Sequence, residues 1–160
     1  MADPSDSFRS VLGHFTTGVT VVTGAGAAGA PVGLTANSMA SVSLRPPLVL
    51  VCLDRGSASL AAILETRRFG ISVLRGQQEA LARRFSAEVP GERFRELELR
   101  RSLGGVPFLP DPLAWLECAL WKPVDAGDHT ILIGEVLAFG ADETGSPLLF
   151  FRGEYGTFEP

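Results

Sequence analysis

Strand-like segments dominate this chain, and helical segments fall between only some of them. The segments rich in apolar, β-branched or aromatic residues are 18–23, 30–44, 47–54, 68–74, 114–125, 130–142 and 147–158. A parallel sheet would require regular βαβ units, and this order of segments does not provide them. The sequence therefore predicts a mostly antiparallel sheet, closed or sandwiched, with helices covering its openings.

The apolar patterns of these segments predict how they are buried. Residues 47–54 (PLVLVCLD) are almost wholly apolar, which favours a strand buried on both faces. Residues 68–74 and 114–125 alternate in side-chain character, as strands with one buried face do.

Three segments have helical spacing. Phe8, Val11, Leu12 and Phe15 follow the i, i+3, i+4, i+7 pattern, with Ser5 and Asp6 as candidate caps. Residues 57–66 form a second candidate, capped by Ser57, with Leu60, Ile63 and Leu64 on one face. Residues 77–86 form a third, with Glu79 and Arg83 at i, i+4.

Residues 87–112 are rich in proline, glycine and charge, and they predict a long surface excursion. Within this stretch, residues 93–101 (RFRELELRR) alternate in sign, which is typical of a solvated helix face.

Gly24, Gly26 and Gly29 form a G-x-G-x-x-G pattern directly after a strand-like segment. A Rossmann site also needs a helix that starts within the glycines and an acidic residue about 20 positions later. Pro31 and Gly33 follow instead, and no Asp or Glu lies between Asp6 and Asp54. The pattern predicts a flexible loop between two strands, so a nucleotide cofactor would bind elsewhere.

The overall composition and charge limit the classes of function that this chain could have. The 160 residues suit one domain, and 46% hydrophobic residues with a mean hydropathy of +0.22 favour an obligate oligomer. A net charge of −4 without a long basic patch argues against nucleic-acid binding. The chain has neither a membrane-spanning apolar run nor a signal-peptide pattern, so we expect a cytoplasmic protein. In that compartment Cys52 and Cys118 are expected to be buried thiols, and a disulfide between them is the alternative.

Familiar catalytic motifs are missing. His14, His129, Cys52 and Cys118 are too irregularly spaced to predict a metal site, and G-x-S-x-G is absent. Cys52 has no basic neighbour that would mark it as a nucleophile. Residues 35–43 (TANSMASVS) combine hydroxyls with small residues, which suits either a phosphate or sugar site or a polar edge strand.

His129 in GDHT, directly before a strand, predicts an imidazole at a strand mouth.

Six segments together resemble the flavin reductase-like family, the short NAD(P)H:flavin oxidoreductases that supply reduced flavin to two-component monooxygenases. They are FRSVLGHFTTGVTVVT, GLTANSMASVSLRPPLVLVCLDRGSAS, RRFGISVL, ARRFS, GDHTILIGEV and LLFFRGEYG, in the family's order along nearly the whole chain. The resemblance implies an FMN-binding split β-barrel over residues 1–160, antiparallel and Greek-key-like, with a few short covering helices. It also implies a homodimer with the flavin near the subunit interface.

The resemblance also implies which residues bind the cofactor. They are Thr35, Ala36, Asn37, Ser38, Ser41, Ser43, Cys52, Leu53, Asp54, Ser57, Ser59, Phe85, Ser86, His129 and Tyr155. Residues 35–38 would follow the isoalloxazine and ribityl chain, residues 52–54 would border the ring, and the serines at 41, 43, 57 and 59 would lie near phosphate. Residues 85–86 would line the distal part of the cofactor. His129 would face the nicotinamide, and Tyr155 would close the pocket.

The activity implied is reduction of FMN or FAD by NADH or NADPH, with a hydride passing from nicotinamide C4 to flavin N5. Such a transfer requires stacked rings rather than a protein acid or base, which accounts for the missing catalytic dyad. The reduced flavin would pass to a monooxygenase component. The alternatives are a flavin- or heme-binding split barrel without turnover, and an unrelated barrel that serves as a binding module.

Overall fold

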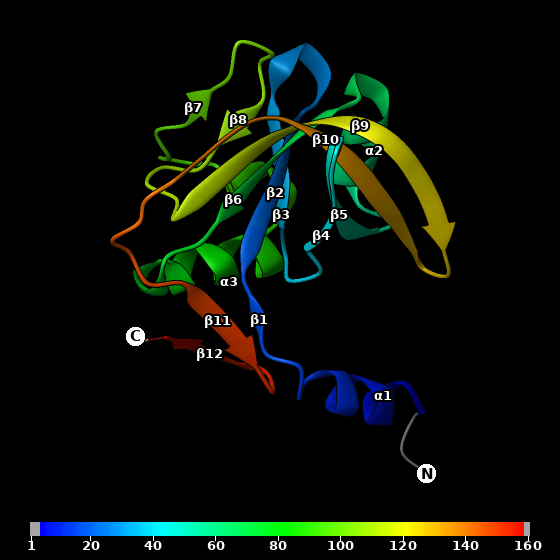
Figure 1. Cartoon of the computed structure of the whole chain (residues 1–160), viewed down its shortest axis with the longest axis vertical. Helices are drawn as coiled ribbons and strands as arrows, with labels where there is room; N and C mark the ends of the chain where they lie inside the picture. The colour runs from blue at the N-terminus through cyan, green and yellow to red at the C-terminus, as the bar shows by residue number, and fades with distance from the viewer. Residues whose placement is uncertain (1–3, 159–160) are drawn as a thin grey trace.

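The computed structural model describes residues 4–158, and its centre is a seven-stranded antiparallel sheet in the order β3-β2-β6-β9-β10-β5-β4 (Figure 1). The strands are β2 (Thr20–Ala25), β3 (Pro31–Ala36), β4 (Ala40–Leu44), β5 (Pro47–Asp54), β6 (Arg68–Val73), β9 (Ala114–Ala126) and β10 (His129–Ala141). Every neighbouring pair is antiparallel. The predicted mostly antiparallel architecture is confirmed.

The strand that is buried on both faces is β2, not β5. Val22 of β2 packs into one core cluster with β5, β6 and α2 (Ala58–Thr66), while Val21 packs into a second cluster with α3 (Glu79–Ala87). In β5, Val49, Val51 and Leu53 are buried, but the alternate residues are only half-buried. The prediction that residues 47–54 form a strand buried on both faces is therefore wrong, because only one face of β5 packs against the core.

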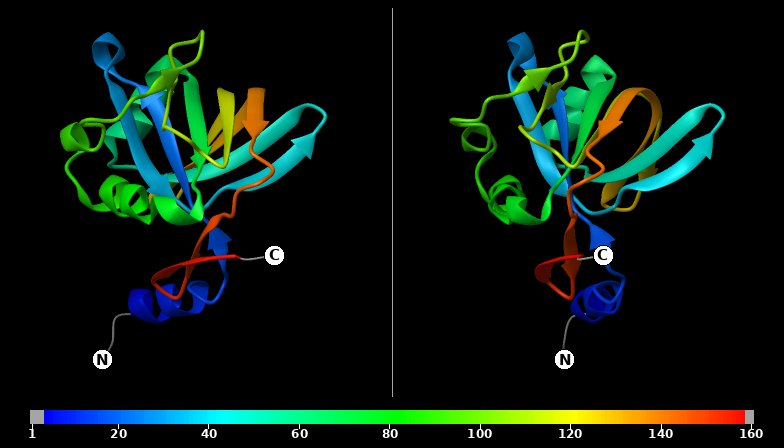
Figure 2. Two further views of the ribbon diagram at one scale, coloured as in Figure 1. Left: turned by 90° about the vertical axis from the view of Figure 1, so that its left-hand side faces the viewer. Right: turned by 60° about the vertical axis from the view of Figure 1, so that its left-hand side comes forward.

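The sheet is strongly curled, and its β4–β5 hairpin extends away from the body of the molecule (Figure 2). Two register shifts interrupt the β9–β10 pairing, between Ile133 and Gly134 and between Val136 and Ala138. Such bulges bend a strand and increase its twist. The curl brings β3 into contact with β5, although the sheet order places four strands between them.

Two of the predicted helices cover the curled sheet. The Ser57 hydroxyl caps α2 by accepting a hydrogen bond from the Leu60 amide at 3.1 Å, as predicted. Leu60 and Ile63 are buried, whereas Leu64 is partly exposed. In α3, which follows the short 3-10 helix η2 (Gly76–Gln78), Arg83 pairs with Glu79 at 2.7 Å.

A small second sheet projects from the barrel toward the N-terminal helix (Figures 1 and 2). It contains β1 (Thr17–Gly18), β11 (Leu148–Phe151) and β12 (Glu154–Thr157), in the order β1-β11-β12. The helix α1 (Pro4–Leu12) is confirmed, and Ser5 and Asp6 lie in its first turn. Its apolar residues Phe8, Val11 and Leu12 are exposed.

The excursion after α3 is only partly a surface segment. It holds the 3-10 helix η3 (Pro90–Glu92) and a two-stranded sheet of β7 (Arg100–Arg101) and β8 (Pro107–Phe108). Val106, Phe108 and Leu109 are buried, so the prediction of a surface excursion is wrong for its last part.

The predicted helix face at residues 93–101 is also wrong. These residues form turns that lead into β7. Phe94, Leu97 and Leu99 pack against the second core cluster, and this burial outweighs the charge alternation.

The glycine-rich segment is the predicted loop between two strands. It joins β2 to β3 in an antiparallel hairpin through the 3-10 helix η1 (Ala27–Gly29). A Cβ on Gly24 would lie 2.9 Å from the Ile63 side chain, and Gly29 has a φ of +76°. Packing and backbone conformation thus explain why glycine occupies these positions, and no nucleotide-binding role is needed to explain them.

No helix within residues 4–158 is long and apolar enough to cross a membrane.

Candidate functional site

A hollow of about 340 Å³ opens where β3 and β5 end and β10 begins. This volume is within the range of small-molecule sites. Most of the predicted cofactor residues line it: Thr35, Ala36, Asn37, Ser38, Cys52, Asp54, Ser57, Phe85, Ser86 and His129. They come from four parts of the chain that the antiparallel fold brings to one end of the sheet.

The pairing register of the strands explains why these residues lie close together. His129 is paired with Asp54 across β10 and β5, so the histidine stands at the same sheet end as the residues that leave β5. Phe85 and Ser86 approach from α3, which packs on β3.

Five predicted residues lie outside this hollow. Ser41 and Ser43 line a separate, largely apolar groove that also contains Leu44 and Phe139. Leu53 and Ser59 are buried in the core region. Tyr155 lines a neighbouring cavity of about 150 Å³. That cavity shares Thr35, Asn37 and Ser86 with the hollow, so Tyr155 stands next to it rather than in it.

Two lining residues were not predicted, Leu34 and Arg93. Leu34 directly precedes residues 35–38 (TANS), and this position in the sequence could have indicated that it lies beside the hollow. Arg93 belongs to the charge-alternating stretch that was expected to be a solvated helix. Its placement depends on how the excursion packs, and no local pattern in the sequence indicates that.

Several hydroxyls of the hollow already serve the fold. The Thr35 hydroxyl donates to the Ala82 carbonyl at 2.7 Å and ties β3 to α3. The Ser86 hydroxyl donates to the Arg83 carbonyl at 2.9 Å. The carboxamide of Asn37, by contrast, makes no hydrogen bond to another residue within 4–158 and is exposed.

Ser38 joins the turn after β3 to the middle of β5. Its hydroxyl accepts a hydrogen bond from the Cys52 amide at 2.9 Å and donates to the Cys52 carbonyl at 3.2 Å. The β4–β5 pairing ends at Leu50, so the serine completes the hydrogen bonding of β5 where β4 no longer reaches. Ser38 therefore fastens the wall of the hollow.

His129 has a fixed partner at the edge of the hollow. Its Nδ1 lies 2.7 Å from Asp128 Oδ1, and hydrogen bonding and charge attraction from His129 lower the pKa of the Asp128 carboxyl. An ionised carboxylate only accepts hydrogen bonds, so Nδ1 carries the proton. In the neutral ring, Nε2 is then an acceptor.

The two cysteines are free thiols. Burial, reinforced by the nearby Glu117 charge, raises the pKa of Cys118 to about 12, so its thiolate is not formed near neutral pH. Cys118 is buried as predicted, whereas Cys52 is half-buried and lines the hollow. Within residues 4–158 no group of three or more His, Cys, Asp or Glu side chains is placed to hold a metal ion.

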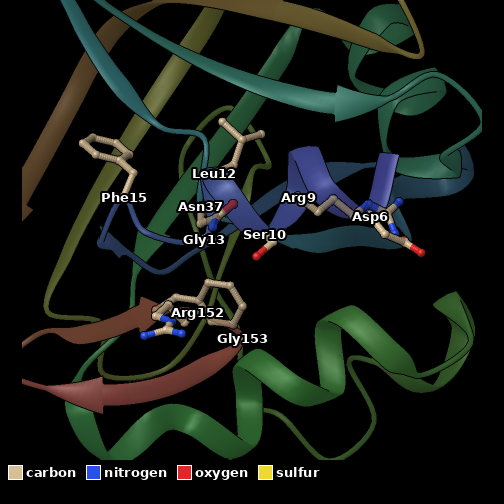
Figure 3. A pocket seen from close by; sticks show the side chains of 10 residues that line it. Asp6, Arg9, Ser10, Leu12, Gly13, Phe15, Asn37, Arg152 and Gly153 are labelled. Carbon is tan, nitrogen blue, oxygen red and sulfur yellow. The ribbon is translucent and has the colours of Figure 1, made fainter. Parts of the chain in front are cut away.

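A larger cavity of about 610 Å³ lies between α1 and the β11–β12 turn (Figure 3). Arg9 and Phe15 line it from the N-terminal side, and Arg152 lines it from the turn. Asn37 lines both this cavity and the hollow, so the two spaces adjoin at that residue.

A curled antiparallel barrel with a polar hollow at its strand ends defines a small split-barrel protein. Residues 12–159 match the model of the flavin reductase-like domain, and the chain belongs to that family. The fold is the predicted split β-barrel.

The chain is similar in sequence to proteins named as flavin reductases and reductase subunits. The chain is 47% identical to a flavin reductase (NADH) of Kitasatospora aureofaciens, over 94% of this chain and 80% of the relative. It is 40% identical to HsaB of Rhodococcus jostii, the reductase subunit of a flavin-dependent monooxygenase, over 96% of this chain and 77% of the relative.

A solved structure agrees with the sequence relatives. The NADH:FAD oxidoreductase SgcE6 of Streptomyces globisporus superposes with a TM-score of 0.91 at 38% identity, over 100% of this chain and 98% of that chain. A second structure of SgcE6, in complex with NAD and FAD fragments, gives a TM-score of 0.90 at 37% identity, covering 100% and 97% of the two chains.

The Ser38 hydrogen bonds lead to a stability prediction. Ser38→Ala leaves the Cys52 amide and carbonyl without their partner and should lower the free energy of unfolding by about 1–2 kcal/mol. Urea unfolding monitored by circular dichroism measures this change. Ser41→Ala, at an exposed position of β4, is the matched control and should change stability by less than about 0.5 kcal/mol. Equal stability of the two variants would contradict the role given to Ser38.

Proposed function

We propose that this protein is an NADH-dependent flavin reductase that binds FMN or FAD in the hollow at the ends of β3 and β5. One observation carries the proposal: in a chain of the flavin reductase-like family, residues from four separate segments line a single hollow of suitable size. Flavin reductases named for NADH are among its relatives at 47% identity.

The lining residues fit a flavin chemically. Leu34, Ala36 and Phe85 offer apolar surface for an aromatic ring system, and the Asn37 carboxamide is free to bond polar ring atoms or ribityl hydroxyls. When bound, the flavin supplies the electron acceptor, whose N5 receives a hydride from C4 of the nicotinamide. The protein's share is to bind the flavin and to hold the nicotinamide at stacking distance.

His129 is the residue that we assign to the nicotinamide. The ring is partly exposed, lies at the edge of the hollow and is oriented by Asp128. Its Nε2 would accept a hydrogen bond from the carboxamide of the nicotinamide. In this role His129 orients the donor and takes no proton from either substrate.

The reduced flavin would serve a partner monooxygenase. HsaB is the reductase subunit of such an enzyme, and this chain covers 77% of its length. We place the reaction in the cytoplasm, as expected from the sequence; the two free thiols support a reducing compartment.

We further propose a homodimer. Leu44 is 89% exposed on the β4–β5 hairpin, and Phe139 is 74% exposed on β10. The two side chains line one largely apolar groove of about 400 Å³. Such an apolar patch on a small chain is typical of a surface covered by a second copy.

Filling the hollow should abolish flavin-dependent turnover. The wild-type protein should oxidise NADH only when FMN or FAD is added. Ser86→Trp places an indole in the hollow from an exposed position of α3 and should weaken flavin binding at least about tenfold. Flavin fluorescence titration and NADH oxidation measure the two effects. Ala80→Trp, also exposed on α3 but outside the hollow, is the control. Flavin bound by the wild type without NADH oxidation would indicate a binding protein instead.

Removing the His129 ring should affect the nicotinamide and spare the flavin. We expect His129→Ala to lower kcat/KM for NADH by about 10- to 100-fold, which is about 1.4–2.7 kcal/mol, with an unchanged flavin Kd. His14→Ala, exposed in the turn after α1, provides the matched histidine control. A folded His129→Ala protein with wild-type kcat/KM for both NADH and NADPH would refute the assignment.

A charge in the apolar groove should separate the subunits. Phe139→Glu is expected to weaken dimerisation by about 2 kcal/mol or more and to reduce flavin affinity together with it. Sedimentation velocity over a range of concentrations measures the association. Leu103→Glu, on the exposed turn before β8, should leave it unchanged. A monomeric wild type that reduces flavin at full rate would contradict the proposal.

A further inference from the structure

Arg93 gives the hollow a fixed positive charge. It follows η3 in the segment after α3, and it is the arginine among the residues that line the hollow. The neighbouring residue Phe94 anchors this segment by packing edge-on against Phe85, with ring centroids 4.8 Å apart. The backbone that carries Arg93 is therefore held by the second core cluster and not by the ligand.

The guanidinium itself is also held by the chain. Nε donates to the Glu88 carbonyl and Nη1 donates to the Gly33 carbonyl, each at 2.8 Å. A Cβ at Gly33 would lie 2.9 Å from the Val22 carbonyl oxygen and 3.0 Å from the Phe94 ring, so the glycine leaves room for Phe94 beside β3. Nη2 makes no hydrogen bond within residues 4–158, so one part of the guanidinium is left for another acceptor.

No carboxylate forms an ion pair with Arg93 within the described chain; Asp54 lines the same hollow, and its Oδ1 accepts a hydrogen bond from the Gly56 amide at 2.7 Å. The acids of the same segment pair with other arginines: Glu88 lies 3.7 Å from Arg84, and Glu92 lies 2.8 Å from Arg95. Arg93 forms no ion pair with residues 4–158, and burial lowers its pKa from the ordinary arginine value. A half-buried, immobilised and unpaired cation in a ligand-sized hollow favours an anion.

We propose that Arg93 binds a phosphate group of the flavin. A guanidinium with free N–H groups matches phosphate oxygens, and the hydroxyls of Ser57 and Ser86 border the same hollow and can add hydrogen bonds. This inference rests on the proposed function, because it assumes that the flavin occupies this hollow. A phosphate of the nicotinamide nucleotide offers the same chemistry, and the experiment below separates the two sources.

The test compares flavins with and without phosphate. Wild type, Arg93→Gln and Arg93→Lys are titrated with riboflavin and with FMN, and binding is followed by flavin fluorescence. For Arg93→Gln we expect FMN to bind about 10- to 100-fold more weakly and riboflavin to bind within about twofold of wild type. Arg93→Lys keeps the charge and should recover part of the FMN affinity. Arg95→Gln, an exposed arginine of the same segment, should bind both flavins as the wild type does.

Three results would overturn the inference. An equal loss for riboflavin and FMN would show that Arg93 only supports the wall of the hollow. Unchanged flavin binding with a raised KM for NADH would place the phosphate of the nicotinamide nucleotide there instead. A wild type that binds neither flavin would overturn the proposed function itself, and that result differs from specific failure of the Arg93 variants.

Discussion

The pairing of β9 with β10 is the interaction on which the rest of the structure depends. β9 leads to β6, β2 and β3, and β10 leads to β5 and β4, so this pair connects the two halves of the sheet. Its two register shifts bend the sheet. Gly134 stands at the first shift, where a Cβ would lie 2.9 Å from the Cys118 Cβ and would clash with the Phe69 ring. The absent side chain lets Phe69 pack over the bend, and the curl then brings β3 beside β5.

The hollow is a consequence of this incomplete closure. Strand β3 reaches β5 without forming a ladder with it, and the Ser38 hydroxyl supplies the hydrogen bonds that a neighbouring strand would have supplied. Polar groups at such an opening serve two purposes. Thr35 and Ser38 hold the walls, whereas Asn37 and one part of the Arg93 guanidinium remain available to a ligand.

The surroundings of the hollow suit a reaction that needs positioning more than acid–base chemistry. The buried thiol of Cys118 has a raised pKa and stays protonated, and the His129 ring is held by Asp128 rather than by a nucleophile. The adjoining cavity at Asn37 is lined by Arg9 and Arg152 together with Asp6, so positive charge predominates among its charged side chains. In the proposed reaction two aromatic systems stack, which requires space, apolar contact and fixed polar ends.

The sequence alone determined the main strands and the cap of α2, because these depend on local periodicity and on side chains close in the chain. Ser57 caps α2, and the glycine pattern forms a hairpin loop, as local rules predict. The tertiary structure decided which faces of the strands are covered by other elements. It buried β2 on both sides in place of β5, and it turned residues 93–101 away from a helix so that Phe94 could pack on Phe85. Arg93 reached the hollow by that packing, because burial of distant apolar residues outweighs the local charge pattern that surrounds it.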